Sequence, residues 1–75
     1  MGFNMIDVSA LGKRISVFRR AAGITQKELA CHVGVTPQAV SKWERGLSCP
    51  DITILDELAE ATNVTIGAIL GVKIL

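Results

Sequence analysis

Three polar side chains, Gln38, Ser41 and Lys42, are spaced so that they would lie on one face of a helix. A glutamine amide can pair with adenine through two hydrogen bonds, and a lysine ammonium can donate to O6 or N7 of guanine. Such a row is typical of a helix that enters the major groove of DNA. It is equally typical of an ordinary amphipathic helix that faces solvent, so the row alone leaves both interpretations open.

Cys31, His32 and Cys49 are the candidates for metal ligation or redox chemistry. A structural zinc site needs four ligands, and neighbouring residues on a helix point about 100° apart and do not converge on one ion. We therefore expect no metal site. A disulfide between the two cysteines is not expected in a reducing cytosol, and a thiol sensor remains the alternative.

Asp56 and Glu60 are the best candidates for acid–base catalysis, because four residues separate them. On an exposed helix face such a pair is usually solvated charge. The chain has no tyrosine and one histidine, and no serine or cysteine is placed to pair with that histidine as a nucleophile. We expect a protein that is not an enzyme, with no cofactor and no small-molecule ligand.

The segment before the polar row predicts a helix that begins after Thr25. Thr25 and Glu28 form the pattern of a capping box, in which each side chain bonds to the backbone N–H of the other residue. Ala30 is small enough to let a second helix approach closely, and Gly34 suits a left-handed stop. The apolar residues at helical spacing are Leu29, Ala30 and Val33.

A second helix is predicted from Pro37 to about Arg45, with Thr36 as its cap. Val40 and Trp43 share its inward face, and Gly46 ends it. The opposite stripe consists of Pro37, Gln38, Ser41, Lys42 and Arg45. Two short helices joined by a tight turn, with a polar stripe on the second, are the pattern of a helix-turn-helix.

Three further helices are predicted at residues 9–22, 51–62 and 66–70, with Ser9 and Thr65 as caps. No alternating pattern of strand length interrupts residues 9–71. We therefore expect an all-α, compact bundle of five helices. The inward residues are expected to be Leu11, Ile15, Phe18, Ala22, Ile54, Leu55, Leu58 and Ala59.

The net charge of +1 conceals an uneven distribution. Residues 11–48 hold seven basic and two acidic residues, a net of +5, whereas residues 49–75 hold one basic and four acidic residues, a net of −3. Neutralisation of phosphates supplies most non-specific DNA affinity. The basic half carries the predicted helix-turn-helix, which favours DNA as the partner of the polar row.

Seventy-five residues make one domain, with an expected core at residues 9–71 and apolar tails at 1–10 and 72–75. The hydrophobic content of 49% exceeds what so small a monomer readily hides. We expect a homodimer whose interface includes Ile66, Ile69, Leu70 and Val72. The alternative is that the tails fold back, as a pairing of residues 3–8 with 72–75. No targeting or membrane-spanning segment is evident.

Residues 11–71, about four fifths of the chain, resemble the phage repressor and Cro family of helix-turn-helix domains, also called the xenobiotic-response-element type. The resemblance is specific because cap, small residue, turn glycine, second cap and core spacing all agree. The matching residues are Gln26, Glu28, Leu29, Ala30, Val33, Gly34, Val35, Val40, Ser41, Lys42, Trp43, Glu44, Arg45, Gly46, Pro50, Leu55, Leu58, Ala59, Ile69, Leu70 and Gly71.

The resemblance implies roles for individual residues. Base reading is implied for Gln38, Ser41 and Lys42, and phosphate contact for Gln26, Lys27, Thr36 and Arg45. Pro37 departs from the polar residue found there in some phage members, which removes one possible base contact. Arg19 and Glu44 match a pair that braces the reading helix in relatives, and Trp43 is expected in the core.

These observations predict a sequence-specific DNA-binding regulator of transcription, located in the bacterial cytoplasm at the nucleoid. A repressor is the favoured kind of regulator. Double-stranded DNA and a second copy of the chain are the expected partners. The alternative is a protein-interaction or antitoxin-type module on the same fold. The basic stripe with Gln38 and Lys42 favours the first hypothesis.

Overall fold

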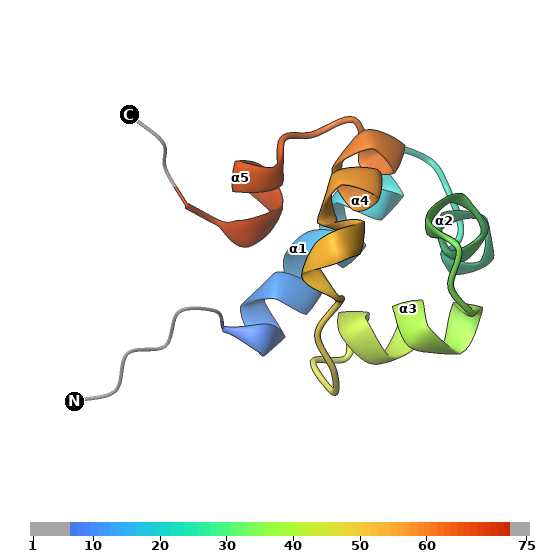
Figure 1. The fold of residues 1–75 in the computed structure, drawn as a ribbon, viewed down its shortest axis with the longest axis horizontal. Helices are drawn as coiled ribbons and strands as arrows, with labels where there is room; N and C mark the ends of the chain where they lie inside the picture. Colours follow the sequence, from blue (N-terminus) through green and yellow to red (C-terminus); the bar gives the residue numbers. More distant parts are fainter. Residues whose placement is uncertain (1–6, 73–75) are drawn as a thin grey trace.

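The computed structural model describes residues 7–72, whose regular secondary structure is entirely helical. The first three helices are α1 (Val8–Ala21), α2 (Gln26–Val33) and α3 (Pro37–Glu44). A short 3₁₀ turn, η1 (Ile52–Ile54), leads into α4 (Leu55–Thr62), and α5 (Ile66–Leu70) follows. Figure 1 shows α3 along one side of the molecule, with α2 at one end of it, while α5 lies on the other side of α1 and α4. The all-α, five-helix architecture confirms the predicted fold class.

The caps explain why α2 and α3 begin and end where they do. The Thr25 hydroxyl accepts from the N–H of Glu28 at 3.0 Å, and the Glu28 carboxylate accepts from the N–H of Thr25 at 2.8 Å, so the predicted capping box is present. Gly34 ends α2 at φ +74°, a left-handed conformation that costs glycine little. Thr36 caps α3, with Pro37 in its first turn.

Two predicted helix starts are wrong in detail. Asp7, not Ser9, caps α1, because its carboxylate accepts from the N–H of Ala10 at 3.1 Å. The fourth helix does not run unbroken from Asp51. Asp51 accepts from the N–H of Thr53, only two residues ahead, and the chain makes a 3₁₀ turn before α4 starts at Leu55.

The core lies where the α-helices meet around α1. α1 packs against α3, α2 packs against α3 and α4, and α5 packs against α4 and α1. The predicted inward residue Ala22 is exposed, and Arg19 is buried at that end of α1 instead. The buried apolar residues are Leu11, Ile15, Leu29, Ala30, Val33, Val40, Trp43, Leu55, Leu58, Ala59 and Ile69.

The predicted tails fall mainly outside the described residues. Residues 1–6 and 73–75 are not described, whereas Val8 opens α1 and so cannot belong to a strand of residues 3–8. None of the helices in the described part of the chain is both long enough and apolar enough to cross a membrane.

Candidate nucleic-acid interface

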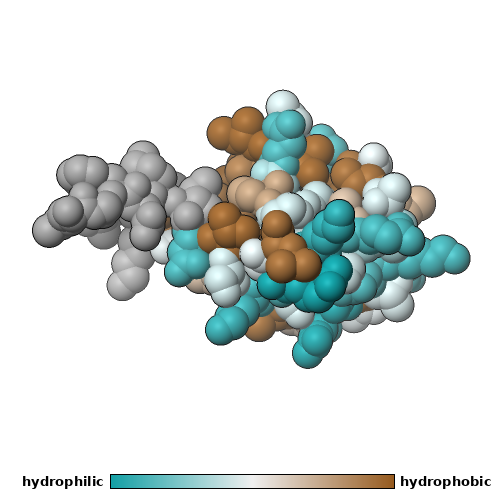
Figure 2. All heavy atoms as spheres, turned by 90° about the horizontal axis from the view of Figure 1, so that it is seen from below, coloured by the Kyte–Doolittle hydropathy of each residue, from teal (hydrophilic) through white to brown (hydrophobic). Residues whose placement is uncertain are grey.

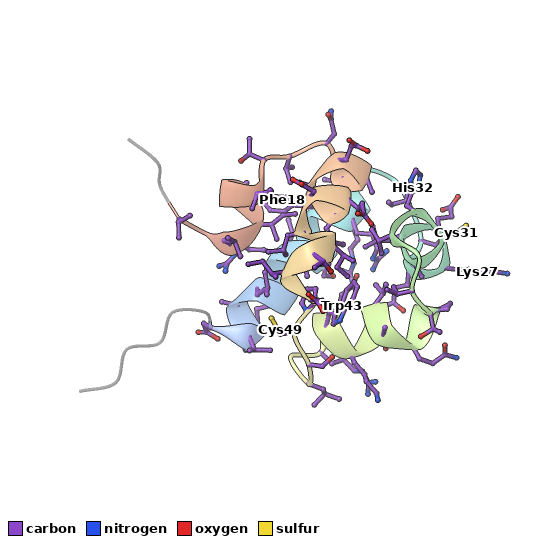
Figure 3. All side chains as sticks on the ribbon, in the orientation of Figure 1. Phe18, Lys27, Cys31, His32, Trp43 and Cys49 are labelled. Carbon is purple, nitrogen blue, oxygen red and sulfur yellow. The ribbon has the colours of Figure 1, made fainter. Side chains whose placement is uncertain are left out.

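The outward face of α3 carries the polar row. Gln38 and Lys42 are exposed and Ser41 is half-buried, while Val40 and Trp43 on the opposite face are 0% and 5% exposed. Figure 3 shows Trp43 between α3 and the rest of the molecule. Burial of this face fixes the rotation of α3, so the row must point away from the core.

Basic side chains flank the row. Lys27 on α2 and Arg45 at the end of α3 are both exposed, and Lys27 points away from the molecule in Figure 3. In Figure 2, which looks onto the α3 side, hydrophilic residues gather on the half of the face toward α2. The helix-turn-helix thus has three exposed cations around the outward face of α3, namely Lys27, Lys42 and Arg45.

Glu44 holds α1, α2 and α3 together. Its carboxylate accepts from Arg19 Nε at 2.6 Å and Arg19 Nη2 at 3.0 Å, and also from Gln26 Nε2 at 3.0 Å. The third guanidinium nitrogen, Arg19 Nη1, donates to the carbonyl of Ile24 at 2.9 Å. The same cation therefore also holds the loop between α1 and α2 in place. An ion pair therefore lies where the resemblance implied one, with side-chain exposures of 11% and 6%.

The Glu44 ion pair shifts the pKa of both partners. Burial disfavours the charged carboxylate of Glu44, but hydrogen bonds from Arg19 and Gln26 outweigh it and hold the Glu44 pKa below its usual value. The hydrogen bond to Glu44 in turn raises the pKa of Arg19, against the opposing effect of burial. Both groups stay ionised, so the brace is a charged pair at neutral pH.

Two of the predicted phosphate-contacting residues already make hydrogen bonds within the chain. One amide hydrogen of Gln26 goes to Glu44, which leaves its second hydrogen and its carbonyl oxygen free. The Thr36 hydroxyl accepts from the N–H of Ala39 and retains its own hydrogen for donation. Both side chains are therefore held in place and can still bind an anion.

Arg14 has a structural contact that the sequence analysis missed. Its Nε donates to the carbonyl of Ile69 at 2.7 Å and its Nη2 to the carbonyl of Leu70 at 3.0 Å. The cation thus binds the C-terminal end of α5, where partial negative charge gathers. This contact could not be predicted from local sequence, because Arg14 and Ile69 are 55 residues apart. Together with Arg19, it removes two of the seven basic residues from the count available to DNA.

The predicted dimer residues do not all lie on the surface. Ile69 is 1% exposed and belongs to the core of its own chain, so its assignment to the interface is wrong. A five-residue segment is too short for helix periodicity to distinguish its inward face from its outward face. Leu70 is half-buried, Ile66 is 36% exposed and Val72 is 53% exposed.

The candidate metal and redox residues are dispersed. Cys31, His32 and Cys49 are all exposed, and Figure 3 places the first two on α2 and Cys49 near the start of α1. Among residues 7–72, no three metal-ligating side chains gather at one place.

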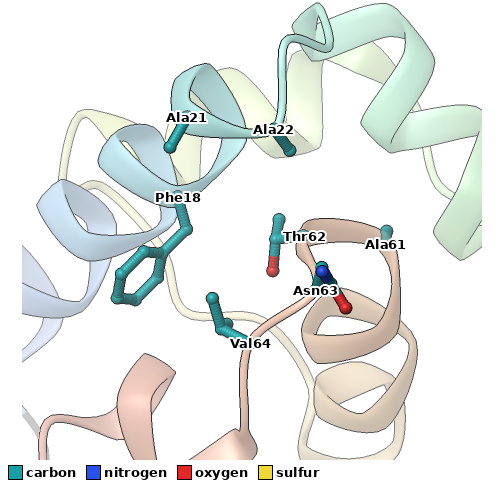
Figure 4. A pocket seen from close by; sticks show the side chains of 7 residues that line it. All are labelled: Phe18, Ala21, Ala22, Ala61, Thr62, Asn63 and Val64. Carbon is teal, nitrogen blue, oxygen red and sulfur yellow. The ribbon is translucent and has the colours of Figure 1, made fainter.

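A hollow of about 470 Å³ lies between the C-terminal ends of α1 and α4, with Phe18 and Val64 on its walls (Figure 4). The buried Thr62 hydroxyl beside it donates to the carbonyl of Leu58 at 2.7 Å. No buried side-chain polar atom of the described residues lacks a hydrogen-bond partner. Among these residues, no unpaired side-chain polar group in the hollow therefore indicates a ligand.

A comparison with protein families gives the family of the chain. A family model described as Helix-turn-helix matches residues 15–69. The chain belongs to the helix-turn-helix family of the phage repressor and Cro type. The match spans α2 and α3, the two helices predicted to form the helix-turn-helix, and the polar row lies on the second of them.

Individual relatives agree with this assignment. The chain is 37% identical over 62 residues to the HTH-type transcriptional regulator ImmR of Bacillus subtilis, which covers 83% of this chain and 49% of ImmR. It is 31% identical over 61 residues to the antitoxin PezA of Streptococcus pneumoniae, with coverages of 81% and 39%. The chain thus spans half or less of the length of these two relatives.

A solved relative shows the same fold with DNA present. The P22 c2 repressor in complex with a synthetic operator superposes with a TM-score of 0.75 at 33% identity, covering 80% of this chain and 91% of that protein. The two proteins therefore share the fold over most of this chain.

Proposed function

We propose that this chain is a sequence-specific DNA-binding regulator of transcription that reads the major groove with α3 and represses by occluding a promoter. The observation that carries the proposal is the outward row on α3, which is fixed by burial of Trp43 and flanked by exposed cations. An α-helix fits the major groove, and the row offers both an amide and an ammonium to base edges.

The proposed roles follow from position. Gln38, Ser41 and Lys42 read bases, because they lie along the outward face of α3. Gln26, Lys27, Thr36 and Arg45 contact phosphates, since they surround that face at the starts of α2 and α3 and at the end of α3. Glu44 acts as a positioning residue, because it holds the Gln26 amide and the reading helix at once.

We expect the regulator to act as a homodimer in the bacterial cytoplasm, bound at the nucleoid. Two-fold symmetry would set two reading helices about 34 Å apart, so that each meets one half of a near-palindromic site. The similarity to ImmR and PezA, both from bacteria, supports this setting.

Selection of bound sites from random duplex DNA tests the proposal. One enriched sequence is expected, and Gln38→Ala should weaken binding to it by about 1 to 3 kcal/mol and relax preference at one base position. Glu60→Ala, at an exposed position on α4, is the control and should leave both unchanged.

The similarity to an antitoxin favours a second candidate, a regulatory module that acts through a protein partner. If selection enriches no sequence and Gln38→Ala binds DNA as the unchanged protein does, base reading by α3 is wrong. The partner-binding module then becomes the better hypothesis.

A further inference from the structure

Two helix ends of the same kind border the hollow between α1 and α4 (Figure 4). Each helix stops in a Schellman motif, in which a residue with positive φ turns the chain back over the last helical turn. Gly23 is that residue after α1, at φ +74°, and Asn63 is that residue after α4, at φ +59°. The hollow therefore has two helix C-termini on its walls.

The last two carbonyl groups of each helix have no hydrogen bond. The N–H groups of each turn bond carbonyls of earlier residues and reach neither of the last two. Within residues 7–72, no donor reaches these four carbonyl oxygens, and all four residues line the hollow. They are Ala21, Ala22, Ala61 and Thr62. Helix carbonyls point toward the C-terminal end, which is the end that borders the hollow, and such an end carries about half a negative elementary charge.

Apolar side chains form the other part of the lining. Phe18 and Val64 are half-buried on the walls, and no charged side chain of the described residues lines the hollow. The two cations in the last turn of α1 do not occupy it. The Arg19 guanidinium is bound by Glu44 and by the carbonyl of Ile24, and Arg20 is exposed outside the lining. The hollow thus combines unpaired acceptors with an apolar wall.

We propose that this hollow binds a small organic ammonium ion, an amine that carries an aromatic or aliphatic body. The ammonium group donates to the unpaired carbonyl oxygens at the ends of α1 and α4, and the body packs against Phe18 and Val64. The inference goes beyond the proposed function. It also departs from the sequence-based expectation that the chain has no small-molecule ligand.

The acceptors and the helix ends select the charge of the ligand. Carbonyl oxygens accept hydrogen bonds and cannot donate them, whereas an ammonium group has three donors and no acceptor. Two C-terminal helix ends attract a cation, and they repel a carboxylate or a phosphate for the same reason. The face of an aromatic ring such as that of Phe18 also attracts a cation within about 6 Å of its centroid. The ligand is therefore a cation and not an anion.

The size and lining of the hollow select an organic cation over a metal ion. Its volume of about 470 Å³ lies within the range of about 300 to 1,000 Å³ that is typical of pockets for small ligands. A hard metal ion needs several oxygen ligands at about 2.0 to 2.6 Å, and the side chains of Phe18 and Val64 supply none. They match the hydrocarbon body of an amine instead. Asn63, which is exposed, adds a side-chain oxygen as a further acceptor.

The hollow lies apart from the outward face of α3. In Figure 1 the C-terminal ends of α1 and α4 are in the upper part of the molecule, and α3 runs along the bottom. None of the described residues that are predicted to contact DNA lines the hollow. Binding of an amine is therefore measured without DNA, and its outcome does not depend on whether α3 reads bases.

Titration of the full chain with probes of similar size, followed by NMR, tests the proposal. Phenethylamine is a cation at neutral pH, phenethyl alcohol is uncharged, and phenylacetate is an anion. Phenethylamine should bind about tenfold more tightly than phenethyl alcohol, because hydrogen bonds from a charged donor are roughly twice as strong as neutral ones. Phenylacetate should not bind, and ethylamine, which has the charge without the ring, should bind more weakly than phenethylamine. The backbone amide signals that shift should be those of residues 18–24 and 61–65.

Variants at exposed positions give a second measurement. Ala22→Lys tethers a competing ammonium group at the hollow and should abolish binding of phenethylamine. Val17→Lys is the matched control, because it adds the same charge to an exposed position of α1 outside the hollow and should bind as the unchanged chain does. Asn63→Gly keeps the left-handed stop of α4 and should weaken binding by about threefold, through loss of one acceptor. Circular dichroism checks that all three variants remain folded.

Three outcomes overturn the proposal. The first is that phenethylamine does not bind at millimolar concentration, or binds no more tightly than phenethyl alcohol, because the carbonyl groups would then select no charge. The second is that the shifted amide signals centre on Asp56, Glu57 and Glu60, which would place the amine on the exposed acids of α4. The third is that Ala22→Lys binds phenethylamine as tightly as Val17→Lys does.

Discussion

The backbone carbonyl oxygen of Trp43 lies against Gly12, with no room for a Cβ atom between them. Gly12 is buried in α1, and Trp43 is in the last turn of α3. The two helices therefore approach backbone to backbone at this point. Glycine is required here for close approach, although it weakens a helix interior by about 1 kcal/mol relative to alanine.

Gly12→Ala should destabilise the fold in spite of its better helix propensity. The added methyl group meets backbone atoms of Trp43 and Glu44, which cannot rotate away as a side chain can. Overpacking of this kind costs about 1 to 3 kcal/mol. Urea denaturation measures the free energy of unfolding, and Val17→Ala on the exposed face of α1 is the control, expected to change it by about 0.5 kcal/mol or less. Equal stability of Gly12→Ala and the unchanged protein would contradict the close approach.

Removing either partner of the Arg19–Glu44 pair should cost more than half of what removing both costs. Arg19→Met or Glu44→Gln alone leaves the other group with restricted access to water and unpaired, a loss of about 3 to 5 kcal/mol for a buried pair. A double-mutant cycle should give a coupling energy of about 1 to 3 kcal/mol. Additive losses in the double variant would show that the pair contributes no coupling.

Acid should destabilise the protein partly through Glu44. Its pKa is lowered in the folded state, so its stabilising effect is full above the ordinary glutamate pKa of about 4.3 and falls away as the pH drops through the lower folded value. Glu44→Gln should therefore flatten the fall of Tm with decreasing pH below about 4.3. Glu57→Gln, an exposed acid on α4, should retain the full fall. Equal slopes in the two variants would argue against the assignment.

DNA binding should depend on salt less steeply than the seven basic residues of 11–48 suggest. With two phosphate-contacting cations in each copy, Lys27 and Arg45, a dimer should show a slope of log K against log salt of about −4, whereas seven in each copy would give about −13. Arg45→Ala should reduce the slope by about 2, one contact in each copy. Arg20→Ala, in the last turn of α1, should leave the slope unchanged. A slope near −13 would mean that all seven contact DNA, so that Arg14 and Arg19 would have left their partners within the chain.

The parts of the fold that depend on neighbouring residues could be predicted from the sequence. The capping box at Thr25, the left-handed stop at Gly34 and the bounds of α5 all follow from local hydrogen bonding and backbone sterics. The predicted cap of α1 was two residues too late because Asp7 and Ser9 are both good caps, and local sequence does not choose between them.

Contacts between distant residues could be predicted only where a family resemblance supplied them. Arg19 and Glu44 are 25 residues apart, and no periodicity connects them. The resemblance did not supply the contacts of Arg14 and Gly12, so these were not predicted. A glycine within a helical pattern is nevertheless a signal of close packing. The roles of individual residues in DNA contact depend on the shape and sequence of the DNA as well as on the chain, so they stay predictions.

Residues 12 and 14 of α1 give one helix two attachments. Gly12 lets the backbone of α3 approach α1 closely, and the Arg14 guanidinium binds the last carbonyls of α5, so both helices are positioned against the same turn of α1. The placement of α3 relative to α5 within one copy is then set by this part of α1. A substitution that displaces α1 should therefore move the outward face of α3 and the end of α5 together.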